Sequence, residues 1–197
     1  VIGVGPEAVA DTASVNENVL LNANNASSTG LLANDDDNAA YDSESLAVTN
    51  VSSNSTGNSG SATQGVLGTY GTLTVAADGT YTYTPNTAAA EALDANDPAT
   101  DVFTYTVKDD DDKNSSTATL TISITGQDDN PVAVSDTGYI NEDGTLAVAD
   151  GGSAVTGTDS NNNNESGDTT GDVLLNDTDA DASATLVVSA ILGGSFG

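Results

Sequence analysis

The sequence predicts an all-β protein built from tandem antiparallel β-sandwich domains. Several short segments alternate threonine with apolar side chains at a period of two, which indicates strands with one buried face. Turn residues separate these segments, and about seven short strands with such turns are typical of a sandwich. The clearest strands are expected at 72–76, 80–84, 102–107 and 118–125, and weaker ones at 9–15, 28–33 and 45–51.

The strand pattern also predicts the core. Asp78-Gly79 separates the segments 72–76 and 80–84 and is a strong signal for a tight hairpin turn. Phe103 and Tyr105 share one face of their strand, as do Leu120 and Ile122 of theirs, so these four side chains are expected to form the core.

Two segments are expected to lie outside the strands. Residues 88–96 form the one helix-like stretch, of one or two turns. Residues 52–61 are rich in Ser, Asn and Gly, which favours a flexible loop.

The chain repeats itself. PEAVADTASVNE at 6–17 matches PVAVSDTGYINE at 131–142, with 7 of 12 positions identical and an offset of 131 − 6 = 125 residues. A period this long fits whole domains in tandem rather than a solenoid. We therefore expect a linker at 1–5, a complete domain at 6–127, an acidic linker at 128–130 and the N-terminal half of a second domain at 131–197. The parent chain is expected to continue, with strand donation by a neighbouring chain as the alternative.

Negative charge dominates the composition. The chain has 30 Asp and Glu against two Lys, with no Arg or His, for a net charge of −28. Carboxylates without cationic partners must stay hydrated, take up protons or bind a hard cation. Closely spaced Asp and Asn oxygens suit calcium, so Ca²⁺ is the expected cofactor.

The same composition excludes several classes of function. Without His or Cys, nucleophilic triads and the usual zinc and iron–sulfur sites cannot form within this segment. The net charge argues against binding nucleic acid or anionic membranes, and no apolar run approaches the ~20 residues of a membrane span. A glycosidase-type carboxylate pair would need an aromatic-lined cleft, yet the chain has no Trp, six Tyr and two Phe. We therefore expect no enzyme.

Strand direction predicts where calcium binds. In an up-and-down passage, strand 9–15 delivers Glu17 to the C-terminal pole of the first domain, whereas the loops 34–37 and 109–112 lie at its N-terminal pole. The loop 176–181 is then expected beside the linker 128–130. The expected ligands are Glu17, Asp35, Asp37, Asp109, Asp110, Asp128, Asp129, Asn130, Glu142, Asp177, Asp179 and Asp181.

Simpler explanations exist for each acidic loop. Asp and Asn are good turn formers without metal, so each loop could be a solvated turn. Residues 109–112 lie between Lys108 and Lys113 and could form a self-neutralising hairpin tip.

The succession LLAND, GTLTVAADGTYTYTP, AAAEALDANDPATDVFTYTVKDD and STATLTISITGQDDNP resembles a VCBS-type, cadherin-like repeat of giant bacterial RTX-type adhesins. This resemblance implies secreted, Ig-like domains that bind calcium and act in adhesion and biofilm formation at the cell surface. It also implies interdomain calcium, held by the end of the first strand, the linker and a loop of the next domain. The chain departs from that pattern in two places. The linker Gly3-Val4-Gly5-Pro6 has no acidic residue, and Thr84-Pro85-Asn86 stands where cadherins place an acidic motif.

Three functions follow from these patterns. The first is a calcium-stiffened extender repeat of an adhesin, whose partners are neighbouring repeats of the same or identical chains, while other domains contact surface glycans or proteins. The second is a subunit of an extracellular filament or surface layer assembled by strand exchange. The third is a carbohydrate-binding module.

Overall fold

The computed structural model describes residues 5–24, 29–37, 45–110, 115–135, 145–147, 156–158, 174 and 177–189. The chain divides into two compact units, Val1–Asp128 and Asp129–Gly197. Each unit is described by itself below.

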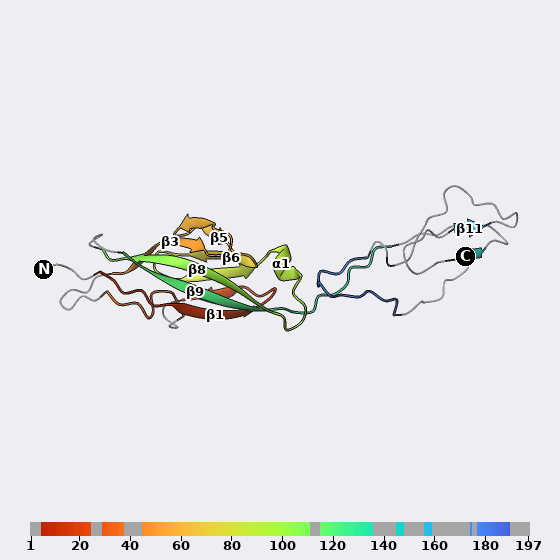
Figure 1. The fold of residues 1–197 in the computed structure, drawn as a ribbon, viewed down its shortest axis with the longest axis horizontal. Helices are drawn as coiled ribbons and strands as arrows, with labels where there is room; N and C mark the ends of the chain where they lie inside the picture. The colour runs from red at the N-terminus through yellow and green to blue at the C-terminus, as the bar shows by residue number, and fades with distance from the viewer. Residues whose placement is uncertain are drawn as a thin grey trace. The chain divides into compact units, whose positions relative to one another are not determined.

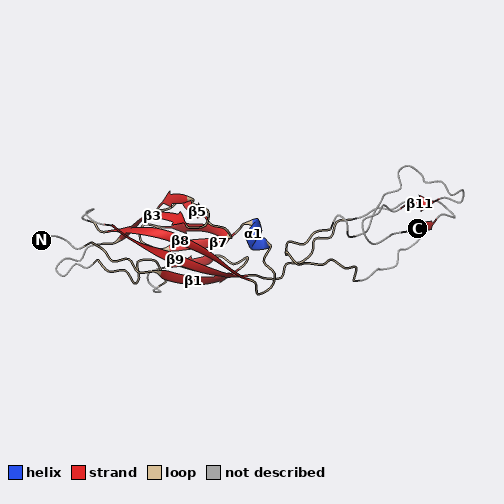
Figure 2. Ribbon diagram, in the orientation of Figure 1, coloured by secondary structure: helices blue, strands red, loops and turns tan. Residues whose placement is uncertain are grey.

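The first unit is a sandwich of two β-sheets (Figures 1 and 2). One sheet has the strand order β1-β9-β8-β3-β4 and the other β2-β7-β6-β5. The strands are β1 (Asp11–Asn16), β2 (Leu21–Ala23), β3 (Ala47–Ser53), β4 (Ser59–Ser61), β5 (Gly65–Leu67), β6 (Gly71–Val75), β7 (Tyr81–Pro85), β8 (Pro98–Lys108) and β9 (Ser115–Thr125). The predicted all-β sandwich is confirmed.

One strand pair departs from the antiparallel pattern. Strands β1 and β9 run parallel, with Asp11 opposite Leu120 and Asn16 opposite Thr125. Both strands run from the N-terminal to the C-terminal pole of the unit, so their adjacency makes the pair parallel. The long pair of β8 and β9 is antiparallel, as are the pairs of the second sheet.

The core lies between the sheets and contains the four side chains that the alternation selects. Phe103, Leu120 and Ile122 are fully buried, and Tyr105 is 1% exposed. The ring of Tyr83 on β7 meets that of Phe103 on β8 edge-on, with centroids 6.2 Å apart, and so joins the two sheets. The outward positions of β8 and β9 are mostly Thr and Ser, including Thr104, Thr106, Thr119, Thr121 and Ser123.

The strand expected at 28–33 is wrong. The described residues there form turns, and Leu31 is fully buried within a loop, where its N–H donates to the Gly79 carbonyl at 2.9 Å. The strand that pairs with β7 is instead Leu21–Ala23. A leucine pair in a loop, with Leu31 buried and Leu32 half-buried, therefore resembled the apolar content of a strand.

The loop expected at 52–61 is shorter and spans 54–58, because β3 extends to Ser53 and β4 forms a short hairpin arm against it. The predicted helix is present but shorter, as α1 (Ala88–Glu91). Thr87 caps it, since its hydroxyl accepts the Ala90 N–H at 3.2 Å. The chain then turns through Asn96, at a φ of 69°, and enters β8 at Pro98, which together prevent a longer helix.

A buried carboxylate joins the two sheets. Asp101 on β8 is 1% exposed and accepts a 2.7 Å hydrogen bond from the Tyr83 hydroxyl on β7. It also accepts the backbone N–H groups of Thr69, Tyr70 and Gly71 at 2.8, 3.0 and 3.2 Å. Four donors compensate for the lost hydration of this charge, so it is stable without a cation.

Two glycines permit this arrangement. A Cβ at Gly68 would lie 2.3 Å from the Asp101 carboxylate, and one at Gly71 would lie 2.5 Å from the Thr84 carbonyl oxygen. The turn 68–71 therefore needs glycine at both ends, because any larger residue would push it away from the carboxylate.

The described part of the second unit contains a small hairpin and one isolated bridge. Strands β10 (Thr145–Ala147) and β11 (Thr156–Thr158) pair antiparallel. Val132 and Thr178 form the bridge, with backbone N–H to oxygen distances of 2.7 and 3.1 Å.

We predict that Asp101→Ala lowers the free energy of unfolding by about 3 kcal/mol or more, because the substitution leaves buried donors without an acceptor. Urea unfolding measures this change. The matched control is Asp97→Ala, an exposed aspartate near the start of the same strand, which should change stability by less than about 0.5 kcal/mol. Equal losses for the two variants would contradict a structural role for Asp101.

Candidate metal-binding sites

The C-terminal pole of the first unit brings Glu17 to a buried position. Glu17 follows β1, is 1% exposed, and its N–H continues the β1–β9 ladder by donating to the Thr125 carbonyl at 2.9 Å. Its Oε2 accepts the N–H of Gln127 at 3.0 Å. The side chain therefore holds the chain where it leaves β9, as the strand-direction argument requires.

A second carboxylate lies beside it. Glu91 is the last residue of α1, and its carboxylate oxygen lies within 4.8 Å of one from Glu17. The sequence reasoning missed Glu91, because it searched Asp-rich loops rather than helix ends. Thr87 was an available signal in the sequence, because threonine is a good helix cap and marks where the short helix begins. In the structure its hydroxyl also donates to the Thr69 carbonyl at 2.9 Å.

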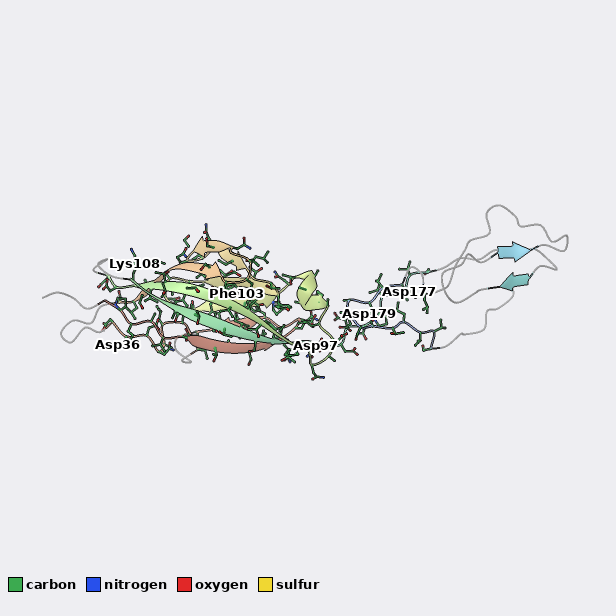
Figure 3. All side chains as sticks on the ribbon, viewed as in Figure 1. Asp36, Asp97, Phe103, Lys108, Asp177 and Asp179 are labelled. Atoms are coloured by element: carbon green, nitrogen blue, oxygen red, sulfur yellow. The ribbon has the colours of Figure 1, made fainter. Side chains whose placement is uncertain are left out.

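The N-terminal pole holds two partly satisfied aspartates (Figure 3 labels nearby Asp36 and Lys108). Asp35 Oδ1 accepts the Val9 N–H at 2.7 Å, whereas its buried Oδ2 accepts no hydrogen bond from the described residues. Asp109 follows β8 and is 7% exposed, and its Oδ1 is likewise buried without a donor among those residues. The neighbouring predicted ligands differ, since Asp37 is half-buried and Asp110 is exposed.

Asp11, which is half-buried, extends this cluster toward the core and was not predicted. Its Oδ2 accepts a 2.7 Å hydrogen bond from the Tyr105 hydroxyl. Burial raises the pKa of Asp11 to about 6, against the lowering effect of that hydrogen bond, and the charge of Asp35 raises it further. Burial also raises the pKa of Asp35. Two neighbouring carboxyls that both resist ionisation store unfavourable electrostatic energy, which a cation or a proton relieves.

The second unit gathers three of its predicted ligands. The N–H of Asp129 donates to Asp181 Oδ2 at 2.8 Å, and the N–H of Asp181 donates to Asp179 Oδ1 at 3.0 Å. Asp181 is 8% exposed, and its Oδ1 accepts no hydrogen bond from the described residues.

The other predicted ligands near the linker lie differently. Asp128 and Asn130 are exposed, and Asp177 is half-buried. Glu142 lies outside the described residues.

The acidic loops of the two copies have the same local structure. Val134 N–H donates to Asp177 Oδ1 at 2.7 Å, as Val9 N–H does to Asp35 Oδ1. The bridge of Val132 with Thr178 likewise corresponds to that of Glu7 with Asp36. The offsets are 134 − 9 = 125 for the segment that begins each copy and 177 − 35 = 142 for the acidic loop, so the second copy holds 17 more residues between segment and loop. The acidic loop is thus a structural feature that both copies of the repeat share.

These clusters offer carboxylate and backbone oxygens, which suit a hard cation such as calcium. Lys108 is the one cationic side chain in the described part of the chain, because Lys113 lies outside it. Close carboxylates therefore have little positive charge nearby to offset their repulsion.

Comparison with known families agrees with this architecture. The bacterial cadherin-like domain matches residues 4–126, which are 123 of the 197 residues of the chain. The chain belongs to this family. A search among curated proteins finds no match.

Membership gives the cadherin-like domain a coarse assignment. Domains of this family are structural and adhesive rather than catalytic, and they suggest an extracellular, adhesin-type repeat that associates with neighbouring repeats. Cadherin-like domains generally bind calcium, and a group of acidic residues that includes Glu17 and Glu91 could hold a metal ion. Within the described residues, no helix is long and apolar enough to cross a membrane.

The pKa of Asp11 predicts how the stability of the cadherin-like domain depends on pH. Its folded-state pKa of about 6 exceeds the ordinary 3.8, so the folded state binds more protons between these values. In chelator, stability should therefore fall as pH rises from about 4 to about 6, before other acids are considered. Asp11→Asn should flatten this part of the profile in thermal melts, whereas exposed Asp36→Asn should not. A wild-type slope that survives in Asp11→Asn would exclude Asp11 as its source.

Proposed function

We propose that this chain is a calcium-stiffened extender repeat of a secreted cell-surface adhesin. The observation that carries the proposal is the pair of Glu17 and Glu91, whose carboxylate oxygens lie within 4.8 Å of each other at the pole where the linker leaves the domain. Two like charges at this separation, one of them on a buried side chain, repel each other strongly. A divalent cation would convert that repulsion into attraction.

Covalent connection brings a further acidic residue to this pole. Gln127 is held by Glu17, and Asp128 is the next residue of the chain. Consecutive Cα atoms are about 3.8 Å apart, so Asp128 stays close to the residue that Glu17 holds. This aspartate can therefore add a ligand to those that the two glutamates supply.

The second unit supports a site of its own. Asp129, Asp179 and Asp181 are joined by backbone-to-carboxylate hydrogen bonds, and the Oδ1 of Asp181 remains available to a cation. Asp129 thus belongs both to the linker and to this group. Calcium bound to it would restrict the linker, which is how repeats in tandem become a stiff extender.

The N-terminal pole supports a third site. The buried Asp35 Oδ2 and Asp109 Oδ1 have no donor among the described residues, so each lacks compensation for its lost hydration. The linker residues Gly5 and Pro6 bring no acid here. Any calcium at this pole must therefore rely on ligands from the domain itself.

We predict that calcium raises the melting temperature of the chain by several degrees. Extracellular calcium modules bind at roughly 10⁻⁴–10⁻³ M, so millimolar calcium adds about 1 kcal/mol per site by mass action. Thermal melts in chelator and in millimolar calcium measure the shift, with magnesium as the control cation. Identical melting curves in chelator and in calcium would refute the proposal.

The C-terminal pole can be tested separately. Glu17→Gln with Glu91→Gln should remove about one site's share of the calcium-induced shift while leaving the chelator melt unchanged or higher, because the mutual repulsion is also lost. The matched control is Glu7→Gln, an exposed glutamate of the same unit, which should keep the full shift. A full calcium response in the double variant would mean that these glutamates are not ligands.

The stiffness of the linker in calcium should depend on Asp129 and Asp179. We expect Asp129→Asn with Asp179→Asn to widen the range of conformations between the domains in calcium, with the melting of the first domain unchanged. Small-angle scattering measures the spread of particle dimensions, and exposed Asp36→Asn is the control. If the double variant scatters like the unaltered chain in calcium, the linker ligands are wrongly assigned.

A further inference from the structure

The outer face of the sheet β2-β7-β6-β5 carries a hollow that none of the candidate metal ligands lines. Its volume is about 420 Å³, which falls within the ~300–1,000 Å³ of small-molecule sites. Three of its side chains stand in one row across neighbouring strands. Asn22 on β2 lies opposite Thr82 on β7, which in turn lies opposite Thr74 on β6. The sheet therefore presents a short row of amide and hydroxyl groups on its outer face.

The row continues onto β5 without a side chain. Gly65 lies opposite Thr74, and a Cβ at Gly65 would lie 3.7 Å from the Thr74 hydroxyl oxygen. Glycine at this position therefore leaves room beside that hydroxyl. Ala76 and Thr80, between β6 and β7, line the hollow beyond the row. Small residues thus surround the polar groups, and their methyl groups supply the apolar part of the surface.

One wall of the hollow is a strained residue. Thr63, in the turn between β4 and β5, lines the hollow and has a φ of 74°. This left-handed conformation suits glycine or asparagine and is costly for a β-branched residue. The turn holds Thr63 there, because its N–H donates to the Val75 carbonyl at 2.6 Å and Gln64 Oε1 accepts the Ser61 N–H at 3.0 Å. Strain of this kind gathers at functional sites.

The polar groups of the hollow are available to a ligand. Four of its side chains make no hydrogen bond within the part of the chain that the structure describes: Asn22, Thr63, Thr74 and Thr82. Other outward threonines are engaged, since Thr72 Oγ1 donates to Asn86 Oδ1 at 3.1 Å and Thr104 Oγ1 donates to Asn54 Oδ1 at 2.8 Å. A hydroxyl and a primary amide each donate and accept. The hollow therefore offers both kinds of partner at close spacing.

The lining of the hollow carries no charge. Among the described residues no Asp, Glu or Lys lines it, although the whole chain has a net charge of −28. The field of the chain disfavours an anionic ligand, and a cation finds stronger partners in the acidic loops. A neutral ligand rich in hydroxyl groups fits best. Its hydroxyls can exchange hydrogen bonds with the threonines and asparagine, while its C–H groups cover the methyl groups.

We propose that this hollow binds neutral saccharides. The row of Asn22, Thr82 and Thr74 binds sugar hydroxyls, and Thr63 adds its own hydroxyl from the adjoining turn. Tyr81 also lines the hollow but is 4% exposed, so it offers no open aromatic platform. A few hydrogen bonds of ordinary strength then give a dissociation constant on the order of 10⁻³ M.

Repetition of the domain would compensate for weak binding at each site. Linked modules engage a polymeric ligand with an avidity far above that of one module. This step rests on the proposed extender function, whereas the binding of one saccharide by one domain does not. A polysaccharide coat is therefore the ligand that an array of such domains would hold, and a short oligosaccharide suffices to test the site.

Amide NMR titration of the whole chain in calcium tests the site, with neutral trisaccharides of α-linked glucose, β-linked glucose, mannose and galactose as probes. At least one should shift the amide signals of β2, β6, β7 and the turn at Thr63 in a saturable way. A galacturonic acid trisaccharide should bind at least about threefold more weakly at low salt, because the field of the chain opposes its carboxylates. Shifts that saturate with none of the four neutral probes, or that saturate only on the other sheet, would overturn the site.

Two variants assign the binding to named residues. Thr82→Val keeps the shape of the side chain and removes the central hydroxyl, so it should weaken binding by about threefold to tenfold. Thr119→Val, on the outer face of the other sheet, is the matched control and should bind like the unaltered chain. Equal affinities for the two variants would show that the row is not the site.

Thr63→Gly separates strain kept for binding from strain kept for folding. Glycine adopts a φ of 74° at little cost, so the melting temperature should stay the same or rise while binding weakens at least about threefold. A lower melting temperature with unchanged affinity would remove Thr63 from the site. Calcium melts give an independent result: saccharide binding without stabilisation by calcium would refute the calcium proposal alone, and the reverse would refute this site alone.

Discussion

The surplus of carboxylates over cations is the constraint on which this structure depends. Thirty acidic residues share one chain with two lysines, so charge pairing cannot position them. The fold instead keeps most charged side chains off the exposed faces of the sheets. The outward positions of β8 and β9 are largely hydroxyl side chains, whereas most acids in the described part of the first unit, apart from Asp11 and Asp101, lie outside the strands. Keeping like charges off the sheets avoids repulsion between neighbouring strands, where opposed charges would be destabilising.

Two different solutions appear where carboxylates are nevertheless buried. Asp101 receives one hydroxyl and three backbone N–H groups, so its charge is compensated entirely by dipoles. Asp35 and Asp109 each retain a buried oxygen without such a donor in the described structure. The first arrangement completes a core, whereas the second leaves electrostatic energy that binding can release. This contrast separates a structural acid from a candidate ligand better than acidity or burial alone.

The sequence predicts whatever rests on strand periodicity. The hairpin around Asp78-Gly79 and the buried faces of β8 and β9 follow from alternation and turn chemistry, which are local. The prediction of a strand at 28–33 failed because Leu31 is buried within a loop. Only tertiary contacts distinguish a leucine buried in a loop from one buried in a strand. Asp101 was overlooked although the alternation that selects Phe103 and Tyr105 places it on the same face. An acid on a predicted core face was the available signal for a buried anchor.

The candidate sites were partly predictable for a related reason. Strand direction brought Glu17 to the correct pole, because direction follows from counting strands. Asp11 was missed because the start of β1 reaches its cluster through packing that no local pattern encodes. Glu91 was missed because attention went to Asp-rich loops, although the capping Thr87 marks the start of its short helix.

Glu17 shows why the poles and the strands form one system. Its backbone N–H extends the β1–β9 ladder, and its carboxylate holds the N–H of Gln127 where the chain leaves the domain. Any cation bound to that carboxylate would therefore restrain both the last hydrogen bond between β1 and β9 and the start of the linker. A ligand at the end of β1 can therefore restrain the point where the chain leaves the domain without altering the core, since the core contacts of Phe103 and Leu120 lie further along the strands.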